Sequence, residues 1–149
     1  MLTKWSASEA RQRWADILDL ALAGQWQVVA AQRRDPVLVA RKAELADLLA
    51  QCRRFEPEVL HEDDGSVVIW LNELDVYGHG DSVQEAAADL IDSVREYVDD
   101  WDDLKDAPNH RDHLWHVRRL QLAEDDADLC RVLFGDELAY DLCRELCPA

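Results

Sequence analysis

Carboxylates are the side chains of this 149-residue sequence whose grouping most suggests metal chemistry. Metal-dependent nucleases bind their ions through paired carboxylates, and aspartates gather here at Asp63, Asp64, Asp99, Asp100, Asp102 and Asp103. They fall in a turn and at a helix end, adjacent acids point to different sides of a helix, and no lysine or histidine is spaced to organise them. We therefore interpret them as solvated charge, assign no catalytic residue, and predict that the protein is not an enzyme.

Histidines and cysteines raise a second metal hypothesis, a zinc site. His110, His113 and His116 are three apart, so each step turns about 60° around a helix, whereas paired helical ligands usually lie four apart. Cys143 and Cys147 have the spacing of four, but two thiols at a chain end make an incomplete site. We predict no metal and no cofactor.

Cationic residues near the N-terminus point to another chemistry, the binding of phosphate groups. Lys4, Arg11 and Arg13 lie close together at the front of a chain whose formal net charge is -16. Residues 1–54 hold nine Lys or Arg and six Asp or Glu, a charge of +3, so residues 55–149 carry -19. Such a division predicts one segment that meets a polyanion and another that repels or imitates one.

The composition, 48% hydrophobic and 32% charged, is that of a globular protein of one large or two small domains. No apolar run approaches the roughly 18 residues that cross a bilayer, and the first residues lack a secretion signal, so we expect a cytoplasmic protein with no membrane partner. Its cysteines are too few for a disulfide framework, and we expect free buried thiols at Cys52, Cys130, Cys143 and Cys147.

A capping box predicts where the first helix begins. Ser6 and Glu9 have the spacing in which each side chain bonds the other residue's backbone N–H, and Gly24 is expected to end the helix. Arg11 and Arg13 flank its apolar stripe on opposite sides, which favours Arg11 as the phosphate contact. The stripe expected to lie on a core comprises Ala10, Trp14, Ile17, Leu18 and Ala21.

A hairpin and a second helix are predicted next. Apolar runs at 28–31 and 37–40 read as strands, and the turn between them carries Arg33 and Arg34. Helical spacing follows at Leu45, Leu48, Leu49 and Cys52, in a helix that ends in two arginines.

The ordered set of these features resembles the N-terminal domain of the Phd/YefM (prevent-host-death) antitoxins over about residues 2–50. The features shared are the Ser-x-x-Glu-Ala-Arg helix start, an aromatic residue three positions later, the glycine break, the hairpin and the following helix. The resemblance implies a domain that pairs through its sheet into a dimer, or a higher homo-oligomer, and binds operator DNA to repress its own operon.

By position, the resemblance places Ser6, Ser8 and Arg11 near phosphates at the start of the first helix. The family often has an arginine directly after the first hairpin strand, where this chain has Ala31, so the hairpin contact is shifted or weakened. The full set of predicted DNA-binding residues is Lys4, Ser6, Ser8, Arg11, Arg13, Arg33 and Arg34.

From Phe55 the pattern changes to antiparallel strands and a covering helix. Runs at 55–60 and 67–71 flank a turn with Asp64 and Gly65, a third strand is expected near Val76 and Tyr77, and Ser82 and Glu85 form a second capping box. The helix keeps one apolar face: Val83, Ala86, Leu90, Val94, Tyr97, Val98 and Trp101.

This segment resembles the HicB-type antitoxin domain, a small degenerate relative of the ribonuclease H fold, over about residues 55–103. The best matches are Asp64-Gly65, Leu74 and Gly80-Asp81-Ser82, whereas the Pro-Gly usual after that leucine is replaced by Asp75-Val76. The resemblance implies a non-catalytic domain that binds and blocks a small ribonuclease toxin.

Three further helices are expected after Pro108, with Gly135 as a break between the last two. Their apolar residues either pack on the sheet or grip a partner, and the pattern does not choose between these. They are Leu114, Val117, Leu129, Val132, Leu133, Leu138, Leu142 and Leu146.

The sequence thus predicts an α+β protein with three parts. Residues 1–54 form a Phd/YefM-like β-α-β-β-α dimerisation and DNA-binding domain, 55–105 a HicB-like antiparallel sheet with a covering helix, and 106–149 a helical segment. The predicted function is an antitoxin-like transcriptional regulator that binds operator DNA as a dimer and occludes a small basic toxin. The formal charge of -19 on residues 55–149 suits this role, because an acidic surface can imitate the RNA that such a toxin binds. The alternative is a scaffold or interaction protein that keeps the fold without binding DNA.

Overall fold

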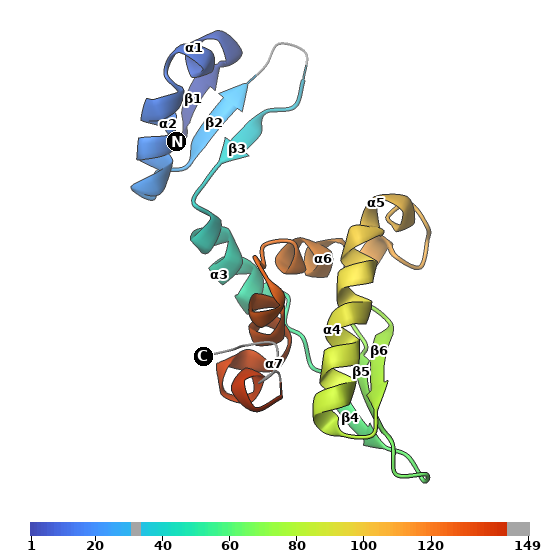
Figure 1. Ribbon diagram of the computed structural model, residues 1–149. Helices are drawn as coiled ribbons and strands as arrows, with labels where there is room; N and C mark the ends of the chain where they lie inside the picture. Colours follow the sequence, from blue (N-terminus) through green and yellow to red (C-terminus); the bar gives the residue numbers. More distant parts are fainter. Residues whose placement is uncertain (31–33, 143–149) are drawn as a thin grey trace. The chain divides into compact units, whose positions relative to one another are not determined.

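The computed structural model describes residues 1–30 and 34–142, which form two compact units, Met1–Leu48 and the chain from Leu49 onward (Figure 1). The first unit contains β1 (Thr3–Ser6), α1 (Ala7–Gln12), α2 (Trp14–Leu22), β2 (Gln27–Ala30), β3 (Val37–Val39) and the start of α3 (Lys42–Cys52). The second contains β4 (Glu58–His61), β5 (Val67–Leu71), β6 (Val76–Gly80), α4 (Val83–Asp99), α5 (Trp101–Leu104), the short 3₁₀ helix η1 (Arg111–His113), α6 (Leu114–Leu120) and α7 (Asp126–Leu142). The predicted α+β class is confirmed.

The sheet of the first unit has the order β1-β2-β3, with β1 parallel to β2 and β2 antiparallel to β3. Ser6 lies opposite Ala30, so the carboxyl ends of β1 and β2 meet at one edge of the sheet. Gln27 is buried on one face, where its Oε1 accepts a hydrogen bond of 2.9 Å from the indole N–H of Trp5. The expected order of strand, helix, hairpin and helix is confirmed.

The first helix begins as predicted but is broken in the middle. The Glu9 backbone N–H donates to Ser6 Oγ at 3.2 Å, and the Ser6 N–H donates to Glu9 Oε2 at 2.8 Å, which completes the capping box. The expectation of one continuous helix is wrong, because Arg13 leaves helical geometry (φ -122°, ψ 31°) and divides α1 from α2. Arg13 still donates to the Glu9 carbonyl and accepts from Ile17, so the chain turns without orphaning these groups.

The break changes which residues of the predicted apolar stripe are buried. Ile17 and Ala21 are buried, but Trp14 and Leu18 remain 49% and 40% exposed, which corrects the prediction that both lie on the core. Leu22, four residues further along α2, is 65% exposed. Trp14, Leu18 and Leu22 form what we call the α2 stripe, an apolar ridge at helical spacing that this unit leaves uncovered.

The second helix of this unit, α3, also departs from the predicted burial. Of the four residues predicted to share an apolar face, only Leu49 is buried, whereas Leu45, Leu48 and Cys52 are exposed. The helix was expected to end in Arg53 and Arg54, but it ends at Cys52, and Arg53 donates a hydrogen bond of 2.8 Å to the Cys52 carbonyl oxygen.

The second unit is built on an antiparallel sheet of order β4-β5-β6. Strand β4 begins at Glu58, three residues later than predicted, because Pro57 has no N–H to pair and Phe55 turns into the core instead. The turn before β5 has Gly65 in the left-handed region (φ 91°), as its Asp-Gly sequence predicts. The third strand is complete, since all five residues of β6 pair with β5.

Helix α4 covers one face of this sheet and approaches β6 unusually closely. A Cβ added at Gly78 would lie 2.2 Å from the Ala86 carbonyl oxygen and 2.3 Å from the Leu90 nitrogen, so only glycine fits. The Ser82 hydroxyl accepts from the Glu85 N–H as predicted, but the Glu85 carboxylate accepts from the N–H of Asp81. In the second capping box, the Glu85 carboxylate therefore bonds the backbone N–H one residue before Ser82.

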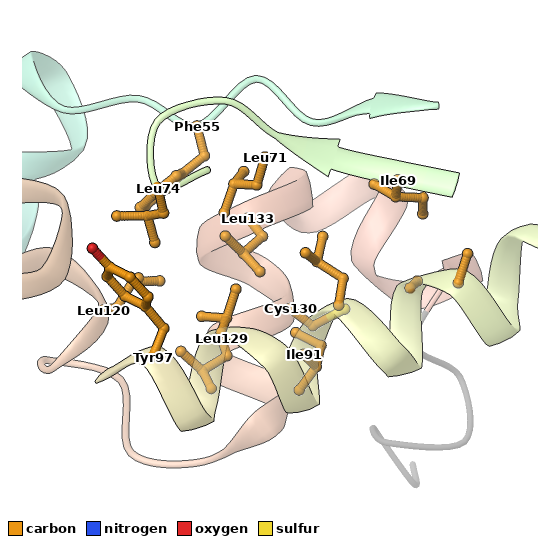
Figure 2. Close-up of a cluster of buried hydrophobic side chains, with 14 of the residues drawn as sticks. Phe55, Ile69, Leu71, Leu74, Ile91, Tyr97, Leu120, Leu129, Cys130 and Leu133 are labelled. Carbon is orange, nitrogen blue, oxygen red and sulfur yellow. The ribbon is translucent and has the colours of Figure 1, made fainter. Parts of the chain in front are cut away.

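The C-terminal helices pack on the same core as the sheet, which answers the question that the sequence left open. Figure 2 shows side chains of the strands facing α4, with residues of α6 and α7 completing the cluster. The fully or nearly buried members include Ile69, Leu71, Leu74, Leu90, Ile91, Val94, Val117, Leu120, Leu129 and Leu133. Gly135 interrupts α7 as predicted (φ 77°), while Leu138 is exposed and Leu146 lies outside the described residues.

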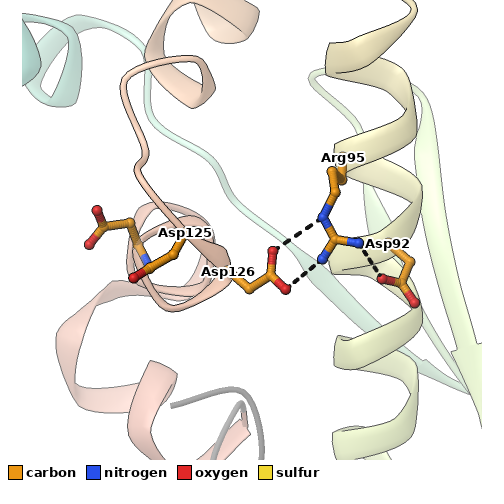
Figure 3. A network of polar contacts seen from close by, with 5 residues as sticks. Asp92, Arg95, Asp125 and Asp126 are labelled. Atoms are coloured by element: carbon orange, nitrogen blue, oxygen red, sulfur yellow. Dashed lines mark hydrogen bonds and ion pairs between the residues drawn. The ribbon is translucent and has the colours of Figure 1, made fainter.

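An arginine ties α4 to α7 at the surface of this core (Figure 3). The Arg95 guanidinium donates to both carboxylate oxygens of Asp126, at 3.2 and 2.6 Å, and to Asp92 at 2.9 Å. The hydrogen bond to Asp126 raises the pKa of Arg95 despite its partial burial. Arg95 is the one Lys or Arg between Arg54 and Lys105, and its charge is already matched by these two acids.

The expectation of free buried thiols is wrong at two positions. Cys130 is buried but disulfide-bonded, and Cys52 is exposed. Cys143 and Cys147 lie outside the described residues. Among the helices of residues 1–30 and 34–142, none has the length and apolar character needed to span a membrane.

Candidate nucleic-acid interface

The sheet topology of the first unit brings most of the predicted DNA-binding residues to one edge. Ser6 ends β1 and lies opposite Ala30 at the end of β2, so the start of α1 and the end of β2 lie at the same end of the sheet. Ser8 and Arg11 are three apart on α1 and are therefore neighbours on its surface. Lys4 and Ser6 share one face of β1.

All six predicted residues that the structure describes are exposed: Lys4, Ser6, Ser8, Arg11, Arg13 and Arg34. Arg33 and Ala31 lie outside the described residues. Among the residues that the structure describes, Lys4, Arg11 and Arg34 make no ion pair with a carboxylate. These three, with Ser8, make up what we call the basic edge.

Arg13 is less available than its exposure suggests. Its Nε donates to Asp16 Oδ2 at 2.7 Å, and its guanidinium lies over the Trp5 ring, 5.2 Å from the centroid. The ion pair neutralises the charge and the ring covers one face of the guanidinium. Arg11 and Arg13 therefore differ in availability, but for a reason other than the helical wheel, which assumed one continuous helix through Arg13.

The start of α1 is also partly occupied. The Ser6 hydroxyl serves the capping box, and the Glu9 carboxylate accepts the Ser6 N–H, so a negative group already sits at the positive end of the helix. Those bonds lower the pKa of Glu9, the backbone bond from Ser6 most and the Ser6 hydroxyl next. An incoming phosphate would find the Ser8 hydroxyl and the cationic side chains more accessible than the Ser6 hydroxyl.

The net charge of the first unit is close to zero, although its cations and anions lie at different positions. Residues 1–48 hold seven Lys or Arg and six Asp or Glu, a formal +1, because Arg53 and Arg54 belong to the second unit. A phosphate-binding surface here depends on where the cations lie, since the net charge is nearly zero.

The α2 stripe is the surface that sequence reasoning missed. Trp14 and Leu18 were assigned to the core because helical spacing alone does not distinguish a face buried within one chain from a face buried between two. Leu22 was not part of the predicted stripe. The width of the apolar arc was a signal that could have revealed this exposed surface. Ile17 and Ala21 already fill the side of α2 that is buried, and Leu22 widens the apolar arc beyond that side.

Comparison with known proteins identifies the family. A family model named PHD-like, described as an antitoxin of toxin-antitoxin, RelE/RelB, TA system, matches residues 1–135. The chain belongs to this antitoxin family. The crystal structure of an antitoxin part of a proposed toxin/antitoxin system from Syntrophomonas wolfei subsp. wolfei is similar, with a TM-score of 0.69 and 21% identity over 91% of this chain and 99% of that one. No curated protein sequence matches significantly.

In this antitoxin, the aspartates that suggested a nuclease do not meet. Asp63 and Asp64 lie in the β4–β5 turn beside the start of α4, and residues 99–103 lie at its far end, about 25 Å away along 17 helical residues. Asp64 accepts from the hydroxyl and N–H of Ser66, which lowers its pKa, and the ion pair with Lys105 lowers the pKa of Asp102. Asp64 thus serves its own turn, and Asp102 serves the helix end that Lys105 closes.

Two of the three histidines considered for a zinc site, His110 and His113, contact the hydroxyl of Tyr97. The Tyr97 hydroxyl lies 2.7 Å from His110 Nδ1 and 2.6 Å from His113 Nδ1, so it can donate to one ring and accept from the other. Burial lowers the pKa of His113 and of His116. Within residues 1–30 and 34–142, no three His, Cys, Asp or Glu side chains are arranged to hold a metal ion.

Proposed function

We propose that this antitoxin represses its own operon by binding operator DNA as a homodimer, and that its second unit neutralises a small basic ribonuclease-type toxin in the cytoplasm. The proposal assigns a Phd/YefM-like role to the first unit and a HicB-like role to the second. The observation that carries it is the basic edge, where three cationic side chains without ion pairs lie beside the start of α1. They are exposed on a chain whose formal net charge is -16.

The dimer is supported by the exposed apolar surface of the first unit. Besides the α2 stripe, Val37 is 62% and Leu38 47% exposed on β3, one of the two edge strands of the sheet. The buried hydrophobic residues of this unit are few and mostly small: Ala10, Ile17 and Ala21. A second copy would cover the apolar ridge and would double the basic edge, which suits a two-fold symmetric operator.

The toxin-binding role is supported by charge. From Leu49 onward the chain holds 26 Asp or Glu and nine Lys or Arg, a formal -17. Such a field repels nucleic acid, accelerates the encounter with a basic protein, and can cover an RNA-binding surface by imitating its ligand. Inhibition would then occur by occlusion.

A mobility-shift titration on the DNA upstream of the antitoxin's own gene tests the first half of this proposal. Three cations per chain make about six phosphate contacts per dimer, so the logarithm of the affinity should fall with the logarithm of salt concentration with a slope of roughly -5. A random fragment of equal length is the control. Equal affinity for both fragments would contradict operator recognition.

Growth rescue tests the second half. The basic protein encoded beside the antitoxin gene is induced alone and together with the antitoxin. Rescue of growth by the full-length antitoxin is expected, and continued arrest in the presence of soluble antitoxin would contradict neutralisation.

A second candidate function, an interaction protein that does not bind DNA, is favoured by a specific observation. Ser6 is engaged in its capping box and Arg13 in a pair with Asp16, so two of the predicted contacts are already occupied. The mobility shift separates the candidates, because the interaction protein would rescue growth without shifting the upstream fragment.

A further inference from the structure

The outer face of the second unit's sheet carries an aromatic pair. Trp70 on β5 and Tyr77 on β6 lie opposite each other, with ring centroids 5.9 Å apart and planes 7° from parallel. Tyr77 is 54% exposed and Trp70 is partly exposed. The Trp70 indole N–H donates to Asn72 Oδ1 at 3.1 Å, which holds the orientation of the ring.

This face is the one that α4 does not cover. Along β5 the buried residues Val67, Ile69 and Leu71 face α4, so the alternate residues Val68 and Trp70 point the other way. Cross-strand register completes the outer face, on which Glu58 flanks Trp70, and Leu60 and His79 flank Val68. Leu60 is 44% exposed.

The segment that forms the sheet carrying the aromatic pair has charges of one sign. Residues 55–82, which form the whole sheet and its turns, contain eight Asp or Glu and no Lys or Arg. Arg95, the next cation along the chain, is paired with Asp92 and Asp126. Aromatic side chains on an open sheet can stack nucleic-acid bases, but a surface of this charge repels phosphates.

We propose that this outer face is the toxin-docking surface, and that it takes an arginine of the basic toxin, stacked on the Trp70–Tyr77 pair and ion-paired with Glu58. The inference rests on the proposed function for the identity of the partner. A guanidinium fits better than an ammonium, because it is planar, stacks on aromatic rings and donates two parallel hydrogen bonds to a carboxylate. Charge complementarity thus selects a cationic protein, and the aromatic pair selects arginine.

The experiment compares three probes on the full-length antitoxin by calorimetric titration: a nine-residue arginine-glycine peptide, the same peptide with lysines, and a nine-nucleotide oligouridylate. The variant W70T/Y77T keeps β-branched residues in both strands. Its matched control is Trp115→Gln, which removes a tryptophan that is 50% exposed on α6. Circular dichroism verifies that each variant is folded.

The wild type and W115Q should bind the arginine peptide more tightly than the lysine peptide. In W70T/Y77T, affinity for the arginine peptide should fall about fivefold and its advantage over lysine should disappear. Glu58→Gln, which leaves both rings in place, should weaken the arginine peptide by roughly twofold to threefold. An unchanged arginine preference in the double variant would overturn the inference, as would tighter binding of oligouridylate that depends on the two rings.

Growth rescue distinguishes a failure of this inference from a failure of the proposed function. If the wild type rescues growth and W70T/Y77T does not, while W115Q does, the docking surface is supported. If the wild type and the double variant rescue equally, the antitoxin function stands and this surface is excluded. If the wild type itself does not rescue, the proposed function fails, and the peptide titration still decides whether the face selects arginine.

Discussion

The two units of this antitoxin combine the same parts, a three-stranded sheet and an amphipathic helix, with different results. In the second unit α4 buries six residues against the sheet and the C-terminal helices, and the core is complete within one chain. In the first unit α2 buries only Ile17 and Ala21 and leaves the α2 stripe exposed. The difference is the basis of our proposal that a second copy of the chain covers the α2 stripe of the first unit.

The largest loss of stability should come from the closest backbone contact in the second unit. Gly78→Ala places a methyl group 2.2 Å from the Ala86 carbonyl oxygen, and because backbone atoms cannot rotate away, α4 must separate from β6. We expect a loss of about 3 kcal/mol in the free energy of unfolding, measured by urea denaturation. Gly65→Ala, which strains a left-handed turn residue but meets no atom within 4 Å, should cost about 1 kcal/mol and is the control.

The second largest effect should be a loss of dimerisation and operator binding, caused by a substitution in the first unit. Leu18→Glu places a charge in the middle of the α2 stripe, where it disfavours a dimer but does not disturb the monomer, since Leu18 is 40% exposed. Sedimentation should show a monomer, with operator affinity reduced more than about tenfold. Gln25→Glu adds the same charge at an exposed loop position as a control. A dimeric Leu18→Glu protein would show that another surface completes the unit.

The basic edge permits a sharper comparison within the first unit. Arg11→Gln should weaken operator binding about tenfold and reduce the salt slope by about two, one phosphate contact from each chain of the dimer. Arg13→Gln should change affinity less than about threefold, because Asp16 and Trp5 already hold its guanidinium. Mobility shifts at several salt concentrations measure both values. Equal losses in the two variants would mean that Arg13 leaves Asp16 when DNA binds.

The elements of both units could be predicted from sequence because local signals determine them. The capping box at Ser6, the Asp-Gly turn before β5 and the break at Gly135 each depend on residues within one turn of chain. The corner at Arg13 has no such signal, since arginine is a good helix former. The close approach at Gly78 depends on a helix distant along the chain, which no local pattern encodes.

The candidate site was predictable in residue type but not in availability. Lys4, Arg11 and Arg34 could be proposed from charge and order, and their exposure agrees with that proposal. The contact of the Arg13 guanidinium with the Trp5 ring depends on the fold, because Trp5 lies on β1 and Arg13 lies at the corner between α1 and α2. Whether an apolar stripe faces its own core or a second chain depends on how much of the helix the sheet covers, which is likewise a tertiary property.

A smaller effect should come from breaking the ion pair that links α7 to α4 in the second unit. Asp126→Asn removes the carboxylate that Arg95 grips with two donors, and should cost about 1 kcal/mol, because the pair is partly exposed. Asp92→Asn, which removes the more exposed single contact, should cost less and is the control. Amide hydrogen exchange should show faster opening in α7 but not in β5 of the Asp126 variant. Equal acceleration in both elements would mean that they open as one unit.

The smallest effect should appear in the first unit as a dependence on pH. The bonds from Ser6 lower the pKa of Glu9 in the folded state, so the ionised carboxylate is favoured by folding. Its contribution is therefore complete above the ordinary glutamate pKa, 4.5, and is lost as the pH falls through the lowered value. Carboxyl resonances followed by NMR should give a titration midpoint for Glu9 below 4.5, and Glu9→Gln should remove the acid-dependent fraying of α1. A Glu9 midpoint no lower than 4.5 would show that the capping box is open in solution.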